Sequence, residues 1–379
     1  MNASPLLKTH ADAGARLAVA PGRETPTEVL LTYGDVPAEY TAATTGALLL
    51  DQGDRGLVEV RGEEALEFLH RVTANRVKGL VRGEGNRGLL LTSKGKIVEE
   101  YDLAVTLHGF RLSTPPERAP KLIAALEMYL FAEDVQLTDL TDSYAPLVVI
   151  GPRAGAVLAE VLGLDAELIA EVKPQHWIAA ELPSLSANPL YVTRTSAAGR
   201  EGFRLEATPE DAAGLWRALS EAGARPGGLA IFDILRAEAC VAQFGVDVDD
   251  TIYPQEARYD DAFSLDKGCY IGQEVVAKID TYGGLNKCLF ALATGDAPIP
   301  AGTRLWRERE PGDWRDVGIV TSWAYSFALD SGLSLAYVKR KHQDVGTEFR
   351  MTAPGEEPKG DEPVATLLET PLEPATDPK

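Results

Sequence analysis

Eight consecutive residues, KGCYIGQE from Lys267 to Glu274, bring together more reactive and hydrogen-bonding side chains than a helix or strand core needs. They supply a cation, a thiol, a phenol, an amide and a carboxylate around two glycines. Glycine lets the backbone approach a ligand closely or adopt positive φ, and buried polar side chains need hydrogen-bonding partners. This octet, residues 267–274, therefore predicts a site for a ligand or a partner. The alternative is a polar turn before a strand, with a half-buried cysteine.

The thiol of Cys269 is the most reactive group in the octet. A thiol attacks only as the thiolate, and a nearby cation such as the Lys267 ammonium stabilises that form. We therefore predict that Cys269 is a functional thiol and that Lys267 assists it. The remaining motif residues would shape the loop or orient a ligand or partner: Gly268, Tyr270, Gly272, Gln273 and Glu274.

The other two cysteines, Cys240 and Cys288, fit the common role of buried, unreactive thiols. Three cysteines without a C-x-x-C pair argue against a disulfide framework and favour a reducing cytosol. None of the five histidines stands at zinc-ligand spacing from a cysteine, so we expect no metal site.

The overall charge restricts the partners. The chain has a formal net charge of −20 and no block rich in Lys or Arg. Such a surface repels phosphate backbones, so we expect small-molecule or protein partners and no direct binding of nucleic acid. The N-terminus has no continuous apolar stretch of the signal-peptide kind, and no run is long enough to span a membrane. We expect a cytoplasmic protein, and nothing in the sequence requires more than a monomer.

With 379 residues the chain should form two or three domains. Residues 57–140 alternate strand and helix patterns. Within Glu63–Thr73, for example, Ala65, Leu69 and Val72 fall on one helical face. A sheet with helices on one face, ferredoxin-like, is the natural packing for this stretch. Short strands separated by Gly and Pro from residue 284 to 353 predict an antiparallel β-barrel. Residues 1–25 form an arm or a loosely packed helix in this interpretation, and residues 354–379 a disordered acidic tail.

Two further signals fall between these regions. Pro146–Ile150 is apolar throughout, which is typical of a buried strand. Gly151 follows it, but no G-x-G-x-x-G or Walker pattern does, so a phosphate-binding loop is disfavoured. Thr208, Pro209 and Asp211 provide an N-cap hydroxyl, a proline at the first helical position and an acid at the third, which predicts a helix start.

The segment Leu235–Glu274 resembles the folate-binding YgfZ family, whose members are relatives of the glycine-cleavage T-protein, an aminomethyltransferase. The elements L-R-x-E-A, F-G-V-D, P-Q-E and K-G-C-x-x-G-Q-E occur in the family's order. Cys240 departs from the pattern, since glycine is usual there, whereas T-proteins lack the cysteine at position 269. The phrase FLHRVTAN, which ends at Asn75, and GPRAG at residues 151–155 resemble further family elements, so the resemblance covers roughly residues 30 to 350.

The resemblance implies an α+β fold: a three-domain, T-protein-like cloverleaf with a ferredoxin-like domain and a C-terminal antiparallel β-barrel. A discontinuous central domain, residues 26–56 and 141–283, would bind tetrahydrofolate or another reduced folate in a cavity. The barrel would close one side of that cavity, and the octet would lie at its rim.

The resemblance also assigns folate-binding residues. Glu100 stands at the T-protein position of a key carboxylate, usually Asp, and Asp102 would replace it if the register shifted; a solvated acidic strand is the alternative. Asn75 ends the first family element. Arg236 is placed for the folate's glutamate carboxylate, unless it forms an ion pair with Asp233 or Glu238.

The hairpin between residues 199 and 204 departs from the T-protein pattern. The sequence is GREGFR, so Glu201 alone keeps an acid, and Arg200 and Arg204 stand where acids are usual. A buried carboxylate suits the donors of a pterin ring, so Glu201 is the predicted contact.

Three functions remain open. The first is a YgfZ-type folate-binding accessory protein, which supports assembly or repair of iron–sulfur clusters in client enzymes, including tRNA-modifying radical-SAM enzymes. Its partners would be folate and iron–sulfur client or assembly proteins. The second is a folate-dependent aminomethyltransferase or other one-carbon transferase of the T-protein type, and the third is a non-catalytic scaffold. The altered hairpin and the octet favour the first.

Overall fold

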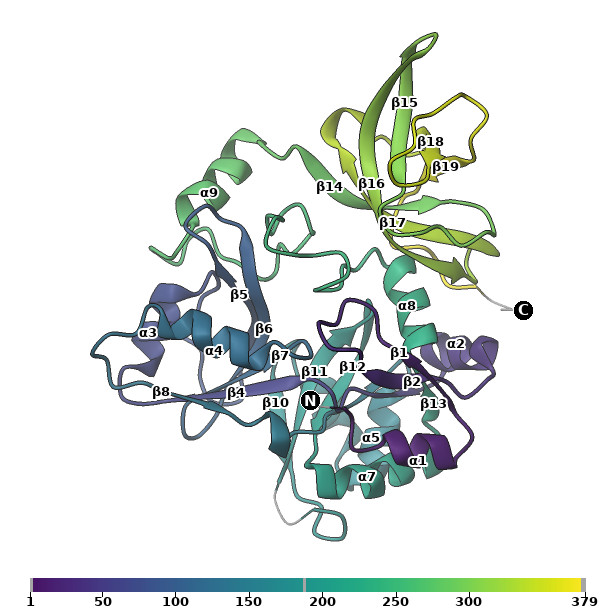
Figure 1. Ribbon diagram of the computed structural model, residues 1–379. Coiled ribbons are helices and arrows are strands. Elements are labelled where there is room, and N and C mark those ends of the chain that lie inside the picture. Colours follow the sequence, from purple (N-terminus) through teal and green to yellow (C-terminus); the bar gives the residue numbers. More distant parts are fainter. Residues whose placement is uncertain (1–2, 187–188, 376–379) are drawn as a thin grey trace.

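The computed structural model describes residues 3–186 and 189–375 of this chain. Figure 1 shows three lobes: a central sheet with helices, a five-stranded sheet with two helices, and a β-barrel that contains the C-terminal strands. The irregular segment after helix α8 runs between the lobes (Figure 1). The fold is therefore the predicted α+β cloverleaf. Within the described residues, no helix is long and apolar enough to cross a bilayer.

The N-terminal residues are part of the folded structure, which corrects the prediction of a loose arm. Helix α1 (Leu7–Asp12) buries His10, and strand β1 (Arg16–Val19) pairs antiparallel with β2 (Glu28–Thr32). Leu6 is 1% exposed in the core of the central lobe. The sequence of this stretch is rich in Ala and Gly, and its stability comes from these contacts with later residues.

The central lobe is built on a six-stranded sheet in the order β10-β11-β12-β9-β3-β13. Neighbouring strands are antiparallel except for β13, which runs parallel to β3. The strands are β3 (Leu48–Asp51), β9 (Leu147–Ile150), β10 (Trp177–Ala180), β11 (Leu190–Ala197), β12 (Arg200–Glu206) and β13 (Arg225–Gly227).

Helices cover both faces of this sheet, which explains why β9 is apolar throughout and β3 is apolar up to its last residue, Asp51. Apolar side chains of α5 (Ala154–Leu162), α6 (Ala166–Glu171) and α7 (Pro209–Glu221) pack on one face. Those of α2 (Val36–Thr45) and α8 (Leu229–Glu238) pack on the other. The helix start predicted at Thr208 is confirmed, because the Thr208 side chain accepts a hydrogen bond from the backbone N–H of Asp211.

The second lobe is a five-stranded antiparallel sheet in the order β5-β6-β7-β4-β8. Its two helices pack into one core with the sheet, as the predicted ferredoxin-like packing requires. The helices are α3 (Ala65–Val72) and α4 (Ala119–Glu127), and the strands are β4 (Gly56–Arg61), β5 (Gly85–Leu91), β6 (Ile97–Val105), β7 (Phe110–Thr114) and β8 (Gln136–Asp139). A 3₁₀ turn, Thr141–Ser143, leads from this lobe to the central sheet.

The C-terminal lobe is a closed six-stranded antiparallel barrel, in the order β14-β17-β16-β15-β18-β19. Its last strand corrects the prediction of a disordered tail from residue 354, because Val364–Leu367 pairs with both β14 and β18 and closes the barrel. The other strands are β14 (Lys287–Ala293), β15 (Arg304–Glu310), β16 (Asp313–Ser326), β17 (Ser331–Lys339) and β18 (Glu348–Thr352), with a 3₁₀ turn at Arg340–His342. The predicted tail also includes residues 376–379, which lie outside the described residues.

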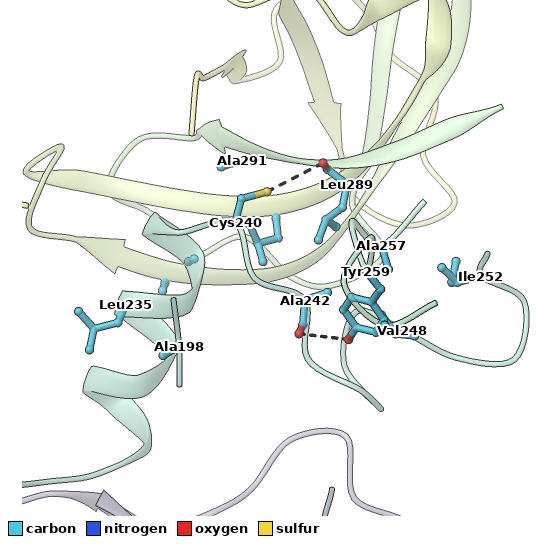
Figure 2. Close-up of a cluster of buried hydrophobic side chains, with 14 of the residues drawn as sticks. Ala198, Leu235, Cys240, Ala242, Val248, Ile252, Ala257, Tyr259, Leu289 and Ala291 are labelled. Atoms are coloured by element: carbon cyan, nitrogen blue, oxygen red, sulfur yellow. Dashed lines mark hydrogen bonds between the residues drawn. The ribbon is translucent and has the colours of Figure 1, made fainter. Parts of the chain in front are cut away.

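The core between the central lobe and the barrel contains Cys240, the residue that departs from the family pattern (Figure 2). Its φ is 55°, a left-handed conformation that glycine adopts at lower cost, which explains why glycine would suit this position. The side chain is 5% exposed, and burial raises the pKa of the Cys240 thiol to about 11. The structure thus agrees with the prediction that this thiol is unreactive.

Candidate functional site

A cavity of about 1040 Å³ lies where the central sheet, the five-stranded sheet and the segment from 241 to 261 meet. Its volume is at the upper end of the range of about 300–1,000 Å³ that is usual for small-molecule sites. Apolar side chains line part of the wall, among them Leu50, Val148, Phe232 and Phe244. Charged side chains, including those from β6, β12 and α8, line other parts of the wall, so the cavity suits a ligand with both apolar and ionic groups.

Two carboxylates, Glu100 and Asp102, reach this cavity from the same face of β6. Alternate residues of a strand point to one face, so these two side chains are neighbours while Tyr101 enters the core behind them. The Glu100 carboxylate accepts a hydrogen bond of 2.9 Å from Arg87. The prediction that Glu100 faces the ligand cavity is consistent with this position, and the exposed acidic strand that was its alternative is not observed.

Asp102 is held by two arginines from different elements. Its Oδ2 accepts a 2.7 Å hydrogen bond from Nη1 of Arg204 on β12, and Nη2 of Arg55 lies 3.6 Å away. Burial alone would raise the pKa of Asp102, but the charges of Arg204 and Arg55 lower it below its ordinary value. Asp102 is therefore an ionised carboxylate in the cavity wall that also joins two lobes.

Asn75 supports the cavity wall without lining it. Its side-chain amide donates to the carbonyl oxygens of Arg87 (2.7 Å) and Asp261 (2.9 Å). Both partners line the cavity, and the Arg87 guanidinium lies 3.8 Å from the centre of the Tyr259 ring. The direct folate contact predicted for Asn75 is thus not supported by its position, which is that of a residue that orients Arg87.

Arg236 lines the cavity, but its charge is already compensated. Its Nε donates to Asp233 and its Nη1 to Asp247, each at 2.7 Å. The ion pair with Asp233 is the alternative that the sequence left open for this residue. Because two carboxylates bind one guanidinium, Arg236 is a poorer site for a ligand carboxylate than the resemblance implies.

Glu201 lies outside the cavity lining, which corrects its predicted contact with a pterin. Side chains alternate along β12, so Glu201 is on the face opposite Arg204. Its carboxylate is 67% exposed and forms an ion pair with Arg194 of β11. From this hairpin the Arg204 side chain lines the cavity, and no acidic side chain does.

The octet is also away from the cavity, because none of its eight residues lines it. The expected position at the rim is therefore not observed. Instead the octet runs into helix α9 (Gln273–Tyr282), which was not predicted from the sequence. Gly272 has a φ of 82°, and a Cβ there would lie 2.5 Å from the Thr92 carbonyl oxygen, so this close approach requires glycine.

Lys267 anchors the octet to the second lobe. Its ammonium is buried and donates to three backbone carbonyls at the end of α3: His70 (2.6 Å), Thr73 (2.5 Å) and Asn75 (2.8 Å). Burial, and to a lesser degree the charge of Arg76, lower the pKa of Lys267 to about 8. Lys267 is thus occupied in holding two segments together, and the described structure records no contact between it and the Cys269 thiol.

Cys269 is exposed at the surface, beside Gly268 and just before α9. Tyr270 is buried, with an unpaired hydroxyl, and packs in the core shared with the barrel. Glu274 is exposed and pairs with Lys278, four residues along α9. The thiol is accessible, and its functional role stays a prediction.

Replacing Lys267 with methionine should lower the free energy of unfolding by about 2–4 kcal/mol, because three carbonyls lose their donor in a partly buried site. Lys278→Met is the matched control: its ammonium is 62% exposed, so its pair with Glu274 should contribute much less to stability. Urea denaturation of both variants measures the difference. Equal stability of the two would show that Lys267 does not anchor the octet.

Several cavity residues were not predicted from the sequence. Arg55 and Arg87 are single arginines in strand-rich stretches, and their partners lie on other elements. Gln243, beside the F-G-V-D element, lines the cavity and has a buried, unpaired Oε1. In the sequence these three residues are marked only by their position near family elements. That position does not show in which direction a side chain points.

Comparisons with known proteins agree with this architecture. The model of the GCVT N-terminal domain matches residues 6–267, and that of the glycine cleavage T-protein C-terminal barrel domain matches residues 287–364. The chain is 31% identical over 360 residues to an aminomethyltransferase of Geobacillus kaustophilus, covering 93% of this chain and 94% of the relative. It is 29% identical to an aminomethyltransferase of Symbiobacterium thermophilum, covering 97% and 96%.

One solved structure shares the fold over the full length. The glycine cleavage system aminomethyltransferase T from Bartonella henselae superposes with a TM-score of 0.82, at 24% identity and with 99% of each chain covered. At that identity the likeness shows the three-lobed fold and nothing about the reaction.

Proposed function

This chain belongs to the family of the glycine cleavage T-protein, and we propose that it binds a reduced folate in its central cavity as a one-carbon transferase of the aminomethyltransferase type. The relatives named aminomethyltransferase, which align over nearly the whole chain, support this proposal. The structural observation that carries it is the pair of neighbouring carboxylates, Glu100 and Asp102, in the wall of a large cavity of mixed polarity.

The cavity wall fits the parts of a tetrahydrofolate molecule. The pterin ring presents N–H donors that suit a carboxylate such as Glu100. The benzoyl group suits apolar side chains such as Phe232 and Phe244. The buried Oε1 of Gln243 has no partner in the described structure and would accept a further hydrogen bond.

When bound, tetrahydrofolate would supply the nitrogens that accept a one-carbon unit. The residues of this chain would bind the folate, exclude water and hold or transfer protons. In this proposal the Glu100 carboxylate holds or moves a proton at the reacting group, since a positioned carboxylate can act as a general acid or base. Arg87 fixes the orientation of Glu100, and Asp102 keeps the two lobes together at the site.

A turnover assay tests this function. The purified protein is given tetrahydrofolate and an aminomethyl donor, and formation of methylenetetrahydrofolate is followed. Product formation that depends on Glu100 supports the transferase, whereas a protein that binds folate without turnover supports the accessory role described next.

A YgfZ-type accessory role is the second candidate, because the octet exposes the Cys269 thiol at the surface. In this case the protein would support assembly or repair of iron–sulfur clusters in client enzymes, including tRNA-modifying radical-SAM enzymes. The thiol would contact a partner protein rather than the folate, since no octet residue lines the cavity.

Under this second candidate, Cys269→Ser should leave tetrahydrofolate affinity unchanged and lower the activity of cluster enzymes in cells to the level of a deletion strain. Cys288→Ser is the control, because that thiol is partly buried and donates to the carbonyl oxygen of Gln255. Client activities are measured in the deletion strain complemented with each variant. Full rescue by Cys269→Ser would remove the thiol from the mechanism.

A further inference from the structure

The cavity wall contains two arginines that share one carboxylate. Arg55 and Arg204 both line the cavity, and within the described residues Asp102 is the one carboxylate in ion-pair range of either. Arg204 is 5% exposed. Buried charges are normally paired, so this part of the wall carries a positive charge that the protein itself does not balance.

The hydrogen bonds of the two guanidinium groups lead to the same conclusion. Arg204 donates to Asp102 through Nη1, while its Nε is buried and has no hydrogen-bond partner among the described residues. Arg55 donates weakly to Ser113, through Nε at 3.3 Å and Nη2 at 3.4 Å. Burial and the charge of Arg204 lower the pKa of Arg55, which agrees with a shortage of negative charge around it.

Arg236 lines the same cavity, but its charge is balanced, unlike the charges of Arg55 and Arg204. Its guanidinium is bound by two carboxylates, Asp233 and Asp247, so no positive charge is left over. Asp247 is further held by the hydroxyl groups of Thr321 and Ser322, which fixes the arrangement. A ligand anion would therefore find an unbalanced cation at Arg55 and Arg204 and not at Arg236.

We propose that Arg55 and Arg204 form the carboxylate-binding site of the cavity. Guanidinium groups bind carboxylates with strong, charge-assisted hydrogen bonds, and Arg204 stands where an acid is usual in this hairpin. The carboxylate belongs either to the glutamate of the folate or to a separate small substrate. The inference rests on the proposed function for the folate, but the anion site itself does not depend on it.

The test compares three probes by calorimetry: tetrahydrofolate, 6-methyltetrahydropterin, which has the ring but no carboxylate, and acetate. Arg204→Lys keeps the charge but loses the Nε donor and the fork geometry. Arg111→Lys is the matched control, because Arg111 pairs with Glu206 on the same strand β12 but does not line the cavity. Arg55→Lys is a second route if Arg204→Lys does not fold.

If the site binds the folate's glutamate, Arg204→Lys lowers the affinity for tetrahydrofolate by about tenfold to a hundredfold. The affinity for 6-methyltetrahydropterin is then unchanged. If it binds a separate substrate, tetrahydrofolate affinity is unchanged and the variant loses acetate binding that the wild type shows. The inference is overturned if neither the Arg204 nor the Arg55 variant alters tetrahydrofolate or acetate binding, or if wild type binds no acetate and binds both pterins equally. If neither pterin binds to wild type, the proposed function fails, and the acetate titration still decides the anion site.

Discussion

Replacing Glu100 with glutamine should lower the rate of aminomethyl transfer by about a hundredfold or more, the usual contribution of a positioned general acid or base. Glutamine has the same shape and can still contact Arg87, but it cannot accept or release a proton in this role. Arg87 keeps a second carboxylate, Asp261, at 3.5 Å, so the cavity wall should remain folded. We therefore expect kcat to fall while tetrahydrofolate affinity changes little.

Glu201→Gln is the control for this experiment. Its carboxylate lies on the face of β12 opposite Arg204 and pairs with Arg194 of β11, so turnover should equal that of the wild type. A Glu100→Gln protein with wild-type kcat would exclude this carboxylate from proton transfer. Loss of activity in Glu201→Gln would instead restore the pterin contact that the sequence suggested and the structure does not support.

Asp102→Asn should lower the free energy of unfolding by about 3–5 kcal/mol, since removing one partner of a buried ion pair leaves the other charges uncompensated. Here the uncompensated charges are Arg204 and Arg55, in the contact between two lobes. Asp266→Asn is the control, because that carboxylate is 85% exposed and its pair with Arg76 should contribute little to stability. Urea denaturation at neutral pH measures both.

The contribution of Asp102 to the free energy of unfolding should depend on pH. The charges of the two arginines, which outweigh the effect of burial, hold the pKa of Asp102 in the folded protein below its ordinary value of about 3.9. Its stabilisation is therefore fully present above about pH 4 and is lost as pH falls through the lower, folded-state pKa. The stability difference between wild type and Asp102→Asn should shrink below about pH 4. A difference that stays constant to pH 2 would contradict the ion-pair account.

Local patterns in the sequence predicted the elements whose stability is mostly local. The apolar run Pro146–Ile150 predicted a buried strand, which the structure shows as β9, and the residues from Thr208 predicted the start of α7. The last barrel strand, Val364–Leu367, was missed because it has four residues between stretches rich in Pro, Glu and Asp. Its place in the structure depends on pairing with β14 and β18 and not on its own propensity.

The arrangement of the site could be predicted only in part, because its contacts join distant residues. Lys267 binds carbonyls 192 to 197 positions away, and Arg204 binds a carboxylate 102 positions away. A lysine beside a cysteine predicts an activated thiol from local sequence alone, and the structure instead uses that ammonium to hold α3. Similarly, the acid in the hairpin suggested Glu201, but the alternation along β12 presents Arg204 to the cavity.

Titration of the wild-type protein with tetrahydrofolate is the decisive measurement, because both the transferase and the accessory role require a folate in the cavity. We expect saturable binding of one molecule per chain, measured by calorimetry, and protection of the cavity segment 241–261 from hydrogen exchange. Absence of heat at high micromolar tetrahydrofolate, with no change in exchange, would rule out both roles and leave the chain as a non-catalytic scaffold of the same fold.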